Sequence, residues 1–97
     1  MLEEKFKKLR NFLMAYFNQD IESPEEALQE YIEKNTKKRI LITIEEIDKF
    51  LSEDLPQQEK ELFIEDNCYL YFPSLELTPI EWLKQVQDEF KRAVDLG

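Results

Sequence analysis

The sequence contains no histidine, one glycine and one cysteine among its 97 residues. Without an imidazole, the chain lacks the usual general base and the commonest metal ligand, which excludes a Ser–His–Asp set and a Cys–His pair. Because the one glycine is Gly97, the glycine-rich phosphate loop, the dinucleotide fingerprint and the EF-hand loop are excluded too. We therefore expect no catalytic residues, no metal and no cofactor, and a protein that is not an enzyme.

The single cysteine, Cys68, cannot form an intramolecular disulfide, so nothing indicates an oxidising compartment. We interpret it as a small buried apolar residue rather than a nucleophile. Residues 1–5 contain no apolar core of a signal peptide, and no run approaches the roughly 20 apolar residues of a membrane helix. These features predict a cytoplasmic protein without a membrane partner.

Positive charge is scarce: 13 basic residues stand against 22 acidic ones, for a net charge of −9. Nucleic-acid binders need a positive surface, and anionic membranes repel a negative one, so both partners are unexpected. A negative surface suits a basic protein partner, because complementary fields steer association. Solubility alone is the other explanation of this charge.

Apolar residues make up 42% of the chain, too much for a disordered segment. They recur at spacings of three and four over about residues 2–18, 24–35, 36–53, 56–67 and 79–96, which is typical of amphipathic helices. The last segment has the clearest predicted inner face, formed by Trp82, Leu83, Val86, Phe90 and Val94, and residues 56–67 have a weak one, formed by Leu62 and Phe63. Ser23–Glu26 and Thr78–Glu81 are capping boxes with proline at the first helical position. The pattern predicts one domain over residues 1–97.

Residues 36–53 are ambiguous. Ile40–Ile44 is rich in β-branched residues and is compatible with a short strand, and Thr43–Glu46 reads as a capping box for a helix that begins late. We favour one helix through most of the segment, because a lone strand has no pairing partner elsewhere in the chain.

An aromatic stretch precedes the last helix. Residues 68–73 are expected to be extended, and alternation would turn Tyr69 and Tyr71 to one side and Leu70 and Phe72 to the other. The predicted fold class is therefore all-α: a compact single-domain bundle of about five helices with an aromatic loop before the last helix.

Two groups of side chains are candidates for binding. Acidic residues at helical spacing precede and follow the start of the second helix: Asp20, Glu22, Glu26, Glu30 and Glu33. Tyr69 and Tyr71 are the second group, because aromatic side chains on loops are favoured at interface centres. The alternatives are an ordinary solvated helix face for the acids and a plug at the end of the bundle for the tyrosines.

Several stretches, in this order and spacing, resemble one family: FLMAYFNQD at residues 12–20, SPEEAL at 23–28, EEID at 45–48, CYLY at 68–71 and TPIEWL at 78–83. The family is the immunity proteins of bacterial contact-dependent growth inhibition (CDI) systems, and the resemblance covers nearly the whole chain. Its most specific part is YFNQD at residues 16–20, followed by the Ser-Pro helix start.

The resemblance implies a cytoplasmic protein that binds the toxic C-terminal domain of a large secreted effector, one to one, and neutralises it. Toxins of these systems are frequently nucleases, an RNase being expected here in preference to a DNase. Inhibition would follow from covering the active site or an adjacent surface.

Two other functions remain open. One is an acidic helical adaptor or structural module with an unrelated protein partner, in which charge serves solubility alone. The other is an enzyme with a catalytic pair of carboxylates; most acidic residues, however, fall where a helix should face water.

Overall fold

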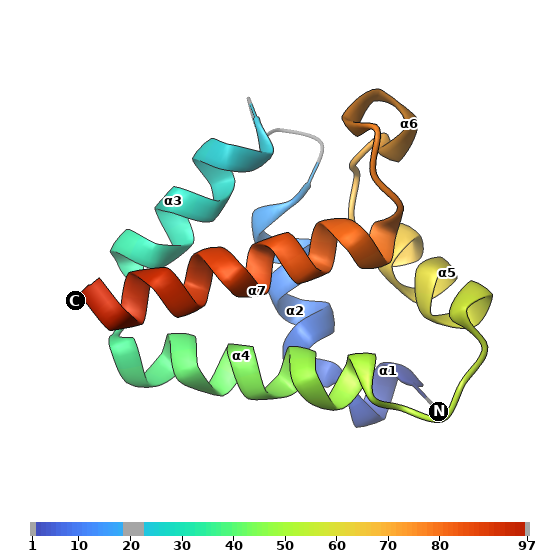
Figure 1. The fold of residues 1–97 in the computed structure, drawn as a ribbon, viewed down its shortest axis with the longest axis horizontal. Helices are drawn as coiled ribbons and strands as arrows, with labels where there is room; N and C mark the ends of the chain where they lie inside the picture. Colours follow the sequence, from blue (N-terminus) through green and yellow to red (C-terminus); the bar gives the residue numbers. More distant parts are fainter. Residues whose placement is uncertain (1, 19–22, 97) are drawn as a thin grey trace.

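The computed structural model describes residues 2–18 and 23–96, and the regular segments of this part of the chain are helices (Figure 1). The all-α prediction is thus confirmed. Two segments are single turns and the other five have ten residues or more: α1 Leu2–Lys5, α2 Lys7–Tyr16, α3 Pro24–Lys34, α4 Lys37–Leu51, α5 Gln57–Asn67, α6 Phe72–Leu75 and α7 Pro79–Leu96. Within the described ranges, no helix is long and apolar enough to cross a membrane.

The two proline-containing helix starts form as predicted. The Ser23 hydroxyl accepts a hydrogen bond from the Glu26 N–H at 3.1 Å. At the start of α7 the exchange is reciprocal: the Thr78 hydroxyl accepts from the Glu81 N–H, and the Glu81 carboxylate accepts from the Thr78 N–H at 2.9 Å. Each bond satisfies a backbone donor that has no partner within its own helix, which fixes where the helix begins.

The ambiguous segment is the single helix α4, so the expectation of one continuous helix is confirmed. Thr36 caps it by accepting from the Arg39 N–H, and the alternative start at Thr43 is wrong. Thr43 lies in mid-helix, where its hydroxyl is 2.6 Å from the buried Tyr31 hydroxyl and donates to the Arg39 carbonyl. Burial of one helical face outweighs the weak β preference of isoleucine.

The core is built around α7, which lies alongside α4, contacts α3 and α5, and crosses α2 in the view of Figure 1. Its predicted inner face is buried throughout: Trp82, Leu83, Val86, Phe90 and Val94. The Phe90 ring lies 5.6 Å from that of Phe12 and 5.2 Å from that of Tyr31. Gln87 adds hydrogen bonds between α7 and α4, because its amide donates to the Ile44 carbonyl and to the Asp48 carboxylate.

Two predictions about the helices are wrong. The first segment is not one helix, because Phe6 leaves helical geometry (φ −116°, ψ 41°) and separates α1 from α2. Its ring packs edge-on against Phe50 at 5.2 Å, which places it in the core. On α5, Leu62 was expected inside but is 48% exposed, and Ile64 is fully buried beside Phe63. The segment is mostly polar, so its sequence pattern distinguishes the two faces poorly.

Candidate functional site

The aromatic stretch is extended from Cys68 to Tyr71, and Phe72 already begins the single turn α6. The predicted extended segment is therefore shorter than expected, because Pro73 is compatible with the first turn of a helix. The predicted alternation is confirmed: Tyr69 and Tyr71 are 72% and 71% exposed, whereas Phe72 is buried and Leu70 is half-buried. The tyrosines consequently do not plug the bundle.

The stretch is fixed to the core from its inner side. The Tyr69 N–H donates to the Phe17 carbonyl at 2.8 Å, which ties it to the residue that ends α2. The Phe72 ring lies 5.8 Å from that of Trp82. Because this backbone is fixed, the exposed side chains of Tyr69 and Tyr71 would lose little conformational freedom on binding. Large aromatic side chains with this property are favoured at the centres of interfaces.

Three of the five acidic candidates lie within the residues that the structure describes. Glu26, Glu30 and Glu33 are exposed on α3, whereas Asp20 and Glu22 lie outside the described residues. The Glu30 carboxylate forms an ion pair with Lys34 at 2.6 Å. The three acids belong to α3 and the tyrosines to the connection between α5 and α6, so the two predicted groups come from separate elements (Figure 1).

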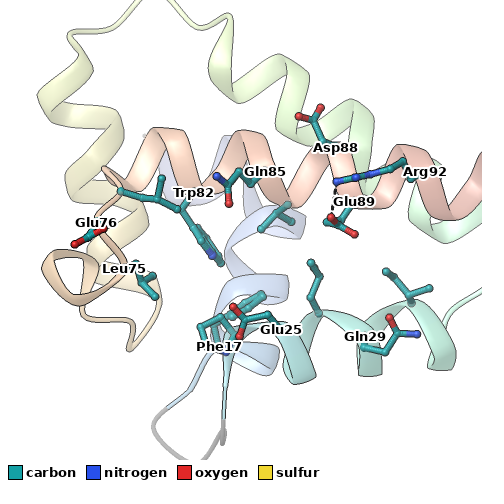
Figure 2. Close-up of a pocket in the computed structure, with 15 residues that line it drawn as sticks. Phe17, Glu25, Gln29, Leu75, Glu76, Trp82, Gln85, Asp88, Glu89 and Arg92 are labelled. Atoms are coloured by element: carbon teal, nitrogen blue, oxygen red, sulfur yellow. Dashed lines mark hydrogen bonds and ion pairs between the residues drawn. The ribbon is translucent and has the colours of Figure 1, made fainter.

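A groove of about 810 Å³ lies between α3, α7 and the segment that follows α6, and none of the candidate acids and tyrosines within the described residues lines it. Its apolar lining consists of Phe17, Pro24, Leu28, Ile32, Leu75, Leu77, Trp82 and Val86. Figure 2 shows Trp82 directed from α7 into the space above Phe17, with Glu25 across from it. The two aromatic rings meet edge to face at 4.9 Å.

The edge of the groove is mostly acidic. Its charged residues are Glu25 from α3, Glu76 from the turn after α6, and Asp88, Glu89 and Arg92 from α7. Arg92 is already paired with Glu89, as the dashed line in Figure 2 marks. Sequence reasoning missed this groove, because its parts are distant in the chain. The one local signal was Leu75 and Leu77 on either side of Glu76.

Cys68 is buried, as predicted, and its thiol donates to the Ile64 carbonyl at 3.1 Å. Burial raises the pKa of this thiol from 9.0 to about 11. At neutral pH it is therefore protonated, which removes the thiolate that nucleophilic or metal chemistry requires. Within residues 2–18 and 23–96, no cluster of three or more metal-ligating side chains is present.

The raised thiol pKa predicts a pH dependence of stability. The folded state holds this proton more tightly than the unfolded state, so the stabilisation is complete below pH 9 and is lost as the pH rises through about 11. We expect the free energy of unfolding to fall by about 2–3 kcal/mol over this range on account of Cys68. Urea titrations of the wild type and of Cys68→Ala measure it as the difference between their pH profiles. Parallel profiles would contradict the prediction.

Comparison with known proteins identifies a family. The family model described as CdiI immunity protein matches residues 5–90, which is most of the chain. Neither the curated proteins nor the solved structures gave a match. The matched region includes α2 to α6 and the first two thirds of α7, and so contains both exposed tyrosines and the whole groove edge except Arg92. The chain belongs to the CdiI immunity protein family.

Proposed function

We propose that this protein binds the toxic C-terminal domain of a cognate effector of contact-dependent growth inhibition, one to one, and neutralises it in the cytoplasm of the cell that produces both. The family match over residues 5–90 is the observation that carries the proposal. It favours this function over an adaptor with an unrelated partner. It also favours binding over catalysis by carboxylates, because an immunity protein needs only to cover its toxin.

The toxin is proposed to be a nuclease, an RNase in preference to a DNase. The support is electrostatic: an enzyme that acts on an anionic substrate presents cations, and this chain has a net charge of −9. Association should therefore be fast at low ionic strength and should slow as salt is added.

Neutralisation is proposed to occur by occlusion of the toxin's active site or of a surface next to it. A stable interface of this kind covers about 800 Å² on each partner. Tyr69 and Tyr71 are proposed as anchors, because they are exposed on a fixed backbone. The acids Glu26, Glu30 and Glu33 would meet lysine or arginine of the toxin.

The test uses the C-terminal domain encoded by the reading frame immediately upstream of this gene. Induction of that domain alone should stop growth, and co-expression of this protein should restore it. The purified pair should elute as one complex, and nucleic-acid cleavage by the toxin should stop at one equivalent. A toxin domain from an unrelated system is the control. A cognate domain that stayed fully lethal and did not bind would refute the proposal.

A further inference from the structure

We infer that the groove between α3 and α7 is the docking site for a basic, amphipathic segment of the toxin domain, in which lysine or arginine alternates with apolar side chains. The inference rests on the proposed function and adds to it the surface that is used and the chemistry that this surface recognises. It does not rest on the acids of α3 that the sequence pattern singled out, since none of Glu26, Glu30 and Glu33 lines the groove.

The apolar part of the groove is an incompletely covered extension of the core. Phe17 and Trp82 are buried beneath it, and four lining side chains pack against the core while remaining partly exposed: Leu28, Ile32, Leu75 and Leu77. Apolar surface that stays in contact with water gains free energy when a partner covers it. A segment with apolar side chains of its own would complete this packing.

The charges at the edge select the sign of the partner. Among the described residues, no cation lies within ion-pair distance of Glu25, Glu76 or Asp88. Arg92, the one basic residue in the described part of the lining, forms an ion pair with Glu89. The lining therefore includes three carboxylates without a cationic partner: Glu25 on α3, Glu76 after α6, and Asp88 on the face of α7 that Figure 2 shows turned away from α3. A neutral segment would leave these carboxylates without a cationic partner, and an acidic segment would place negative charge next to them.

Lysine and arginine fit both properties at once. Each has an apolar stem that can lie along leucine and isoleucine, and a charged head that can reach a carboxylate several ångströms away. An enzyme that binds an anionic substrate presents such side chains around its active site. Insertion of a basic segment into the groove would withdraw those cations from the substrate as well as cover the site.

The test compares two double variants with the same change in charge. Glu25→Lys with Glu76→Lys reverses the edge, and Glu45→Lys with Asp95→Lys reverses two exposed carboxylates on α4 and α7 outside the groove. All four positions are exposed, and urea unfolding of each variant checks that the fold is retained. Binding of the purified cognate toxin domain is measured by calorimetry at two salt concentrations.

The edge variant should raise the dissociation constant on the order of 100-fold, and the control variant less than about 5-fold. A third variant tests the floor without a change in charge: Gln85→Trp places a large ring in the groove from an exposed position and should weaken binding by a similar factor.

The outcomes separate the inference from the proposed function. If the wild type neither binds nor neutralises the toxin domain, the proposed function fails, and the groove inference fails with it. If the wild type binds but the edge and control variants weaken binding equally, the groove inference alone is refuted. It is also refuted if sedimentation shows that the wild type self-associates and that Gln85→Trp abolishes this, because the occupant would then be a second copy of the chain.

Discussion

Replacement of both Tyr69 and Tyr71 by alanine is expected to weaken binding of the toxin domain by about 100-fold or more while leaving the fold intact. Each ring is more than two thirds exposed, so its removal withdraws little from the core. Aromatic side chains at the centre of an interface commonly contribute 2 kcal/mol or more each, about a 30-fold change in affinity. Calorimetric titration and urea unfolding of the same preparations measure the two effects.

The matched control removes apolar surface elsewhere. Leu41 and Leu62 are exposed on α4 and α5, and Leu41→Ala with Leu62→Ala should leave affinity within about 3-fold of the wild type. Tyrosine-to-phenylalanine variants at positions 69 and 71 then show how much of the loss of affinity is due to the ring and how much to the hydroxyl. An alanine pair that binds as tightly as the wild type would show that the tyrosines lie outside the interface.

The largest effect on stability is expected from Phe90→Ala. The ring is fully buried in α7, where it contacts Phe12 and stacks on Tyr31. Truncation of a buried phenylalanine costs about 3–5 kcal/mol, because transfer free energy is lost and a cavity is left. Since small domains are stable by only about 5–15 kcal/mol, much of the folding free energy would be removed. The midpoint of urea unfolding should fall accordingly.

Two control variants show whether the loss of packing causes this loss of stability. Phe90→Leu keeps most of the volume and should cost well under half as much. Lys91→Ala, at the next position on the exposed side of α7, should change stability by less than about 0.5 kcal/mol. If Phe90→Ala were as stable as Lys91→Ala, the aromatic contacts around Phe90 would not hold α7 in place.

The sequence predicts the elements of this fold well where one face of a helix is strongly apolar. The inner face of α7 was identified residue by residue, and the starts of α3 and α7 followed from their capping residues. The exposure of Tyr69 and Tyr71 and the burial of Phe72 also followed from simple alternation along an extended segment. Each of these features depends on neighbours in the chain, and local patterns record such neighbours directly.

Features that depend on distant parts of the chain were not predicted. The break at Phe6 results from packing against Phe50, more than forty residues away. The groove unites the end of α2, one side of α3 and the middle of α7, and nothing local marks Trp82 as lying across from Glu25. Spacing along one helix groups acids on that helix alone, which explains why the predicted acidic face and the groove edge are different sets.

The charged side chains at the groove edge are exposed and form no part of the buried core. Glu25, Glu76 and Asp88 are exposed, whereas α7 is held in the core by the buried rings of Trp82 and Phe90 and is joined to α4 by Gln87. Exposed positions of this kind tolerate substitution at a cost usually within about 0.5 kcal/mol. Lineages of this chain can therefore exchange one set of edge charges for another and acquire a new specificity, while the scaffold that presents them stays the same.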